Sequence, residues 1–274
     1  MGLQEVKAEA KRILTAHHII NFLLLFSFYL TKVIPPFCQW LYRGKQECHI
    51  DTREHEILLF LIVVVFWKNR KSTNWLHTLS TLFLFGKLAN LLLFYRLSPV
   101  VAFAFGLLCI LQLVLFPEPA YTGPDKVIYF QAGALQEELK RNPRVTWLVE
   151  FYASWSPECR HVFPVFAKLS EKYTLPNLRF GKLDVGKLSK EAEHFRVNSH
   201  ATSRQLPTFS LFQNGKERNR LPVVDRNGRA VKYVFKEENV ILDLDLNNLY
   251  ESCLQNLSKE EKKTLEAEEA KKKQ

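Results

Sequence analysis

The sequence predicts an α/β domain preceded by an all-α membrane region, and three observations support this fold class. Four mostly apolar runs occupy the first 116 residues, at 13–34, 57–67, 76–95 and 99–116. A linker at residues 117–126 follows, and its prolines and glycine disfavour both helix and sheet. Beyond the linker, short apolar strands alternate with amphipathic helices, which is the pattern of a mixed sheet covered by helices.

The charge of the chain favours a membrane protein over a nucleic-acid-binding protein. Its 38 Lys and Arg against 28 Asp and Glu give a formal net charge of +10, but much of the basic charge lies beside the apolar runs and in the carboxyl-terminal tail. The sequence has no periodic basic and aromatic stripe and no nucleic-acid-binding motif. We therefore expect membrane lipid, and no nucleic acid, among its partners.

The five cysteines are too few and too scattered for a disulfide-stabilised scaffold. None forms a Cys-x-x-Cys pair, and no zinc-binding pattern occurs, so we expect neither a metal nor another cofactor. Cys38 and Cys48 close a small loop if their segment faces an oxidising lumen. Two free thiols in a connecting segment are the alternative.

The first apolar run is typical of a signal anchor. A basic stem with Lys7, Lys11 and Arg12 precedes it, as in a signal peptide, but the run is long for a signal peptide and no small-x-small cleavage site follows. The run at 57–67 covers about half of a roughly 30 Å hydrocarbon core. Lys87 interrupts the third run, so we expect it to reach the interface or to face a partner.

Basic residues also predict the side of the membrane that each part faces. The basic stem and the cluster at residues 68–71 are expected on the cytoplasmic side, which places residues 35–56 in the lumen. Four crossings then put the rest of the chain in the cytosol. If the second and third runs do not cross, the carboxyl-terminal half is still cytosolic.

The soluble domain is expected at residues 127–252, and a charged tail at residues 253–274 follows it. Gly215 is expected to form a turn between the last two strands, and residues 218–228 a surface loop. The expected strands are 127–130, 144–152, 177–184, 208–212 and 231–235, and the expected helices are 135–141, 157–173, 189–195 and 237–250.

The most informative stretch begins at Glu150 and ends at Cys159. A short apolar strand runs directly into a helix, for which Ser156 offers a capping hydroxyl and Pro157 the first turn. Cys159 falls in that first turn, where free N–H groups and the helix dipole favour a thiolate. A cysteine in place of Ser156 would complete the Cys-x-x-Cys dithiol of a disulfide oxidoreductase.

The stretch Glu150-Phe-Tyr-Ala-Ser-Trp-Ser-Pro-Glu-Cys159 resembles the active-site strand and helix of the thioredoxin and protein disulfide isomerase family. Gln205-Leu-Pro-Thr208 resembles that family's cis-proline loop. With the four apolar runs ahead, the serine at 156 and Gly228-Arg-Ala-Val231 near the end, the resemblance covers nearly the whole chain. It implies a thioredoxin fold in an endoplasmic reticulum membrane protein, and it suggests a disulfide-linked homodimer.

The resemblance implies that Ser156 replaces the attacking cysteine and that Cys159 holds the resolving position. A hydroxyl forms no mixed disulfide, so ordinary dithiol exchange is not expected. Burial raises the pKa of a resolving thiol, whereas the helix terminus with Arg160 and His161 nearby lowers it. Cys159 is therefore either a redox thiol, acting on partner proteins or peptides that carry thiols, or an inert buried side chain.

Further roles follow from the same resemblance. Glu150 matches the buried acid that serves proton transfer at the resolving thiol, and a merely retained, hydrogen-bonded acid is the alternative. Trp155, Pro207 and Thr208 match the peptide-binding surface, where a cis proline presents backbone to an extended polypeptide. A purely structural use of the proline turn is the alternative.

The carboxyl-terminal tail contains two motifs that predict the location of the protein in the cell. Lys271 and Lys272 resemble a dilysine retrieval signal for the endoplasmic reticulum, which is read on the cytosolic side, although a charged solvated tail contains such lysines too. Asn256-Leu-Ser258 is a glycosylation sequon that is used only in the lumen. We expect an endoplasmic reticulum membrane protein with a cytosolic domain and carboxyl terminus, with the mitochondria-associated membrane as a second location.

Three functional hypotheses follow. The first is a membrane thioredoxin-like protein that regulates redox state and protein folding through partner binding and the single thiol of Cys159, with catalytic turnover not expected. The second is a disulfide oxidoreductase or isomerase that pairs Cys159 with a cysteine outside the motif, such as Cys253 or one from a second chain. The third is an inert membrane scaffold.

Overall fold

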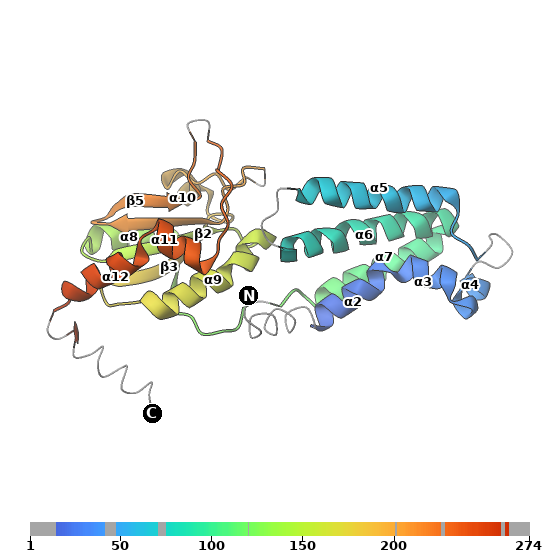
Figure 1. Cartoon of the computed structure of the whole chain (residues 1–274), viewed down its shortest axis with the longest axis horizontal. Helices are drawn as coiled ribbons and strands as arrows, with labels where there is room; N and C mark the ends of the chain where they lie inside the picture. Colours follow the sequence, from blue (N-terminus) through green and yellow to red (C-terminus); the bar gives the residue numbers. More distant parts are fainter. Residues whose placement is uncertain are drawn as a thin grey trace, which may run out of the picture. The chain divides into compact units, whose positions relative to one another are not determined.

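The computed structural model forms two compact units, Met1–Ala120 and Tyr121–Gln274 (Figure 1). The basic stem, Lys71 and the two tail lysines, Lys271 and Lys272, lie outside the described residues. The structure describes residues 15–41, 48–70, 75–119, 121–200, 202–225, 228–258 and 261–262, without the side chains of Trp40, Trp75 and His77.

The first unit is helical, and helix α6 lies at its centre, in contact with α2, α5 and α7. By length and composition, the segments Ala16–Val33 and Thr78–Leu97 could cross a membrane, and Pro99–Leu115 is a shorter apolar helix. Large apolar side chains such as Phe66 (73% exposed) and Val100 (76%) point outward, as expected for a lipid-facing surface. The helices are α2 (Ala16–Leu25), α3 (Ser27–Val33), α4 (Pro35–Leu41), α5 (Thr52–Asn69), α6 (Trp75–Leu97) and α7 (Pro99–Leu115).

Helix α5 is longer than the apolar run that predicted it. Asp51 caps its start: the Asp51 side chain accepts from the Thr52 N–H at 2.7 Å, and Glu54 Oε2 accepts from the Asp51 N–H at 2.9 Å. This capping box extends the helix through polar residues ahead of residue 57. The segment predicted to be a polar connection also contains a helix, α4.

The first apolar run is interrupted at Phe26, between α2 and α3. Asn90 of α6 bridges the break, because its side-chain amide donates to Leu24 O at 2.8 Å and to Leu25 O at 2.6 Å. One turn earlier on α6, a Cβ atom at Gly86 would overlap the Leu25 side chain. A small residue and an amide on α6 therefore let α2 approach closely and satisfy the carbonyls that the break exposes.

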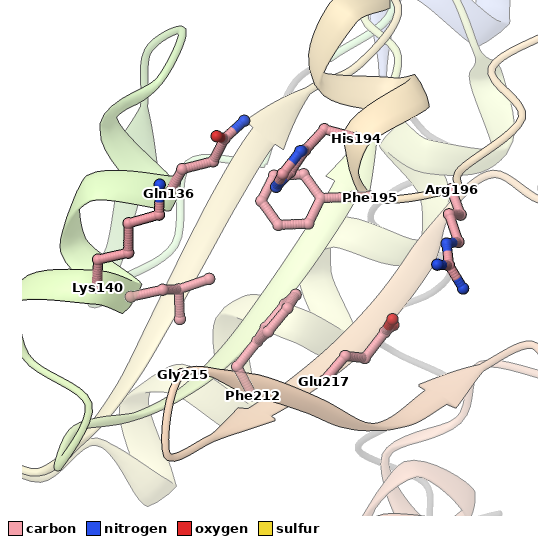
Figure 2. Close-up of a pocket in the computed structure, with 9 residues that line it drawn as sticks. Gln136, Lys140, His194, Phe195, Arg196, Phe212, Gly215 and Glu217 are labelled. Atoms are coloured by element: carbon pink, nitrogen blue, oxygen red, sulfur yellow. The ribbon is translucent and has the colours of Figure 1, made fainter.

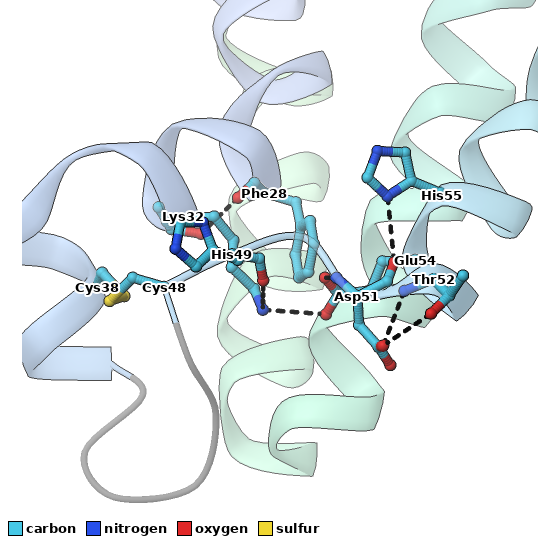
Figure 3. A network of polar contacts seen from close by, with 10 residues as sticks. Phe28, Lys32, Cys38, Cys48, His49, Asp51, Thr52, Glu54 and His55 are labelled. Carbon is cyan, nitrogen blue, oxygen red and sulfur yellow. Dashed lines mark hydrogen bonds and ion pairs between the residues drawn. A yellow bond between two sulfur atoms is a disulfide. The ribbon is translucent and has the colours of Figure 1, made fainter.

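A polar network and a disulfide lie together in the first unit (Figure 3). Cys38 of α4 and Cys48 form a disulfide, which decides between the two alternatives left open by the sequence. Next to it, Lys32 is 2% exposed, and its ammonium contacts Glu54 Oε1 at 3.2 Å and His49 O at 3.2 Å. The buried lysine thus has a counter-charge within its own unit.

The second unit is built on a five-stranded mixed sheet of order β1-β3-β2-β4-β5. Strands β1, β3 and β2 are parallel, and β4 and β5 are antiparallel to their neighbours. The strands are β1 (Val127–Phe130), β2 (Thr146–Tyr152), β3 (Leu178–Asp184), β4 (Thr208–Gln213) and β5 (Lys216–Leu221); the helices are α8 (Ala134–Arg141), α9 (Pro157–Tyr173), α10 (Ser189–His194), α11 (Glu237–Asp243) and α12 (Leu246–Gln255).

Helices cover both faces of this sheet, because side chains alternate along the central strand β2. Leu148 points into a core with α9, α11 and α12, whereas Trp147, Val149 and Phe151 point into a core with α8 and α10. All four side chains are at most 1% exposed. This arrangement, a mixed sheet sandwiched between helices, is the predicted thioredoxin fold.

Two sequence-based assignments in this unit were wrong. The final hairpin uses β5 rather than residues 231–235, because Asn214 (φ +52°) and Gly215 (φ +73°) form a tight turn that pairs β4 with the residues immediately following. The first residues of the expected surface loop, 218–221, therefore belong to a strand. The expected helix 237–250 is also broken, at Leu244 and Asp245, and continues as α12 to Gln255.

Candidate functional site

The candidate site lies where β2 ends and α9 begins. Trp155 is 50% exposed in the connecting loop, and Ser156 occupies the position before the first helical residue, Pro157. The Ser156 side chain makes no capping hydrogen bond to the helix backbone, which corrects the capping role expected for it. The hydroxyl instead forms a hydrogen bond with the sulfur of Cys159.

Cys159 is enclosed at the start of α9, with 1% of its surface exposed. Burial raises the pKa of the thiol to about 11, although hydrogen bonds from the Ser156 side chain and the Ala153 backbone act in the opposite direction. Burial is the largest influence on this pKa, so the net shift, whose direction the sequence left open, is upward. At pH 7 such a thiol is ionised in roughly one molecule in ten thousand.

A buried ion pair lies on the strands beneath the thiol. Glu150 of β2 is directly opposite Lys182 of β3, and Glu150 Oε2 is 3.3 Å from Lys182 Nζ. Burial raises the pKa of the Glu150 carboxyl to about 7, and the attraction of Lys182 opposes that shift. The Lys182 ammonium also lies over the rings of Phe163 (3.6 Å to the centroid) and Tyr152 (4.2 Å).

The proline loop reaches the same end of the sheet, because Thr208 at the start of β4 pairs with Phe151 near the end of β2. The Leu206–Pro207 peptide bond is cis, as the resemblance implied. Pro207 and Thr208 are buried, and the Thr208 hydroxyl donates to Gln205 O at 2.6 Å. This leaves Trp155 as the exposed side chain among the three expected to bind peptide.

Three residues support the site although sequence reasoning did not single them out for a role. Lys182 is one of two cations in β3, and it is the buried one, whereas Arg179 is partly exposed. Gly186 leaves room for the Trp155 side chain. A Cβ atom at position 186 would lie 2.9 Å from the indole Nε1 and 2.7 Å from the Ala153 Cβ. Gln205 fixes the proline loop, because its side chain accepts from Asn198 N–H at 2.8 Å and donates to Gly228 O at 2.9 Å.

A separate pocket of about 290 Å³ opens on the α8 and α10 side of the sheet (Figure 2). Its buried lining residues are Leu139 of α8, Phe195, which directly follows α10, and Phe212 of β4. None of the motif residues from Trp155 to Cys159 lines it. The pocket is lined by Gln136, Leu139, Lys140, His194, Phe195, Arg196, Phe212, Gly215 and Glu217.

The remaining free cysteines are distant from the site or lie in the other unit. Cys109 is on α7, and Cys253 of α12 is 7% exposed with a hydrogen bond to the Thr146 side chain at the start of β2. Cys159 follows the other end of that strand, about 20 Å away at 3.3 Å per residue. Within the described ranges, no group of three or more His, Cys, Asp or Glu is arranged to hold a metal.

A match to a protein-family model agrees with this architecture. The Thioredoxin family model matches residues 126–234. The crystal structure of a thioredoxin from Nicotiana alata is 29% identical, covers 46% of this chain and 97% of its own, and superposes with a TM-score of 0.35. The sheet topology, the family match and the apolar helices together define a membrane thioredoxin-like protein.

Relatives that match most of the chain give the family. The thioredoxin-related transmembrane protein 2 homolog of Caenorhabditis elegans is 49% identical, over 88% of this chain and 92% of its own length. Thioredoxin-related transmembrane protein 2 of Xenopus tropicalis is 40% identical, over 86% of this chain and 84% of its own. The chain belongs to the thioredoxin-related transmembrane protein 2 family.

Proposed function

We propose that this protein is a regulator of redox state and protein folding in the endoplasmic reticulum membrane, acting by binding partner polypeptides. Its single motif thiol, Cys159, reacts slowly, and the protein does not carry out dithiol–disulfide exchange. Proteins or peptides that bear thiols, including a second copy of this chain, are its proposed partners.

The observation that carries the proposal is the Ser156–Cys159 pair. The group that would attack a disulfide is a hydroxyl, and it is hydrogen-bonded to a thiol that is 1% exposed. A hydroxyl is a weak nucleophile near neutral pH and forms no mixed disulfide. Cys159 in turn is a poor initial nucleophile, because its raised pKa keeps it protonated.

Pairing with Cys253 does not restore exchange within the folded unit. The two thiols lie near opposite ends of β2, roughly 20 Å apart, whereas a disulfide requires Cα atoms within about 7 Å. Oxidoreductase activity would therefore require a cysteine sulfur supplied by another chain.

The surface left for binding is centred on the exposed Trp155 side chain, which lies at the same end of the sheet as the buried cis-proline loop. An indole that is 50% exposed offers a large apolar contact. Gly186 leaves room for the indole, and the Gln205 side chain fixes the proline loop through its hydrogen bonds with Asn198 N–H and Gly228 O. An apolar anchor of this kind suits the side chains of an extended polypeptide.

The proposed orientation places the thioredoxin-like unit in the cytosol. Two features support it: the Cys38–Cys48 disulfide falls in the segment predicted to be lumenal, where disulfides persist, and Cys159 and Cys253 are free thiols. The predicted dilysine signal at Lys271 and Lys272 would also function on the cytosolic side.

Binding of an unfolded polypeptide tests this function. With the full chain in lipid nanodiscs and labelled, reduced and alkylated lactalbumin as the probe, we expect Trp155→Ala to weaken binding at least fivefold, because it removes the apolar anchor. Leu242→Ala is the matched control, since Leu242 is 79% exposed on α11. Cys159→Ser should bind like the wild type.

Two results would refute the proposal. One is the absence of binding by the wild type, and the other is equal binding by the Trp155→Ala and Leu242→Ala variants.

A further inference from the structure

Lys87 lies in the middle of an apolar helix. It is near the centre of the apolar segment Thr78–Leu97, so that about 14 Å of helix separate it from either end. The four-carbon stem of a lysine spans less than half of this distance, so the ammonium does not reach the interfacial region by extending along the helix. A cation at this depth of a membrane is costly unless it has a counter-charge.

The contacts of Lys87 within the unit are neutral. Its ammonium donates to Gln112 Oε1 of α7 at 2.5 Å, and Gln112 Nε2 donates onward to Phe116 O at 3.2 Å. Its ionisable neighbour is Cys109, also on α7. No carboxylate among the described residues forms an ion pair with Lys87, so an amide alone compensates for part of its lost hydration.

Lys32, in the same unit, is a buried lysine that does have a counter-charge. It is 2% exposed and contacts Glu54 at 3.2 Å. In the sequence, residues 10–46 and 57–116 contain no Asp or Glu, so the acidic residues nearest to the apolar runs lie beyond their ends, at Glu9, between residues 47 and 56, and at Glu118. A second copy of this chain therefore has no carboxylate in the middle of a helix to place beside Lys87.

The surface around Lys87 is apolar and open. Leu84 (65% exposed) and Leu88 (53%) flank Lys87 on α6, and Leu108 (54%) and Leu111 (52%) flank Gln112 on α7. We call these four leucines with Lys87 and Gln112 the α6–α7 face. A helix packed on this face would contact leucines on both sides of the ammonium.

We propose that the α6–α7 face binds a transmembrane helix of another protein that carries an Asp or Glu near its centre, with Lys87 as the counter-charge. Charge complementarity supports this pairing, because an isolated carboxylate and an isolated ammonium are each costly in hydrocarbon and pairing compensates for both. The exposed leucines supply apolar packing around the pair. The sequence between residues 57 and 116, which includes Lys87, contains no acid that could take this place.

Association with designed helices tests the proposal. The full chain, carrying a donor fluorophore, is placed in phosphatidylcholine vesicles with acceptor-labelled leucine-rich transmembrane peptides that contain one central Glu, Gln or Leu. We expect the Glu peptide to associate at least tenfold more tightly than the Leu peptide. Lys87→Leu should abolish this preference, and Lys87→Arg should retain it, because the charge is kept.

Lys68→Leu is the control, since Lys68 lies in the last turn of α5, over the ring of Phe85, and not in the middle of a helix. It should keep the preference for the Glu peptide. Equal association of the three peptides with the wild-type chain would overturn the proposal. Because this comparison uses only the wild-type chain, it does not depend on whether a variant folds. A preference that survives in Lys87→Leu, or that appears only when anionic lipid is added, would overturn it as well.

Discussion

Burial sets the protonation of both ionisable groups of the candidate site. Cys159 and Glu150 are each enclosed, and for a thiol as for a carboxyl, burial disfavours the charged form and raises the pKa. The two groups also repel one another when both are ionised, and this contributes to the raised pKa of Cys159. The pH at which each group loses its proton is therefore a direct measure of how completely the fold encloses it.

Alkylation of Cys159 should be slow and should accelerate steeply with pH. Because folding raises its pKa to about 11, the thiolate is scarce at neutral pH, and the rate should rise about tenfold per pH unit between pH 7 and pH 10 without a plateau. Iodoacetamide labelling of the full chain, read by mass spectrometry of the Cys159 peptide, measures this. A plateau near pH 8 would show a thiol of ordinary acidity.

Glu150 should lose its proton near neutral pH rather than in acid. Its folded-state pKa of about 7 lies above the ordinary value of 4.5, so the protonated carboxyl is present at pH 5 and disappears as the pH rises through 7. Infrared difference spectra of the full chain should show the carbonyl stretch of a protonated carboxyl at pH 5, which Glu150→Gln removes. Identical spectra of the two proteins would contradict the raised pKa.

At the scale of elements, the strand and helix of the site could be predicted because their patterns are local. The apolar run of β2 and the helical spacing of Val162, Phe166 and Leu169 in α9 are visible in the sequence, and so is the proline at the start of α9. Strand β5 was missed since it is a charged edge strand, Lys-Glu-Arg-Asn-Arg-Leu, without an apolar alternation.

What could not be predicted from the sequence depends on contacts between elements. The Glu150–Lys182 pair follows from the register of two strands, and the break in the first apolar run depends on Asn90 from a distant helix. The outcome at Cys159 depends on how completely the fold encloses the thiol, which local sequence does not specify. Gly186 matters because Ala153 and the Trp155 indole both lie against it.

Replacement of Asn90 should destabilise the helical unit. Asn90→Leu removes two hydrogen bonds that connect α6 to the carbonyls at the α2–α3 break, which should cost about 1–2 kcal/mol in the free energy of unfolding. Unfolding of the full chain by sodium dodecyl sulfate, followed by circular dichroism, measures the change.

Asn69→Leu is the matched control for this experiment. Asn69 donates to Val65 O within its own helix, so its loss should change the unfolding free energy by less than about 0.5 kcal/mol. Equal costs for the two replacements would show that the Asn90 bridge between helices contributes nothing specific.

At the scale of the whole molecule, the proposed orientation makes different predictions for each side of the membrane. In intact microsomes, added protease should digest the thioredoxin-like unit, and Asn256 should stay unglycosylated although it belongs to a sequon. An alkylating reagent added after denaturation should show Cys159 free and Cys38 bound to Cys48. A protected unit glycosylated at Asn256 would place the domain in the lumen.

The central claim is that this fold binds partners but lacks dithiol exchange, and the reduction of insulin by the full chain with glutathione tests it most directly. The wild type should show no turnover above that of Cys159→Ser, because Ser156 forms no mixed disulfide. Ser156→Cys should raise the rate at least tenfold, because it restores an attacking thiol at the start of α9. Repeated turnover by the wild type that Cys159→Ser abolishes would contradict the account.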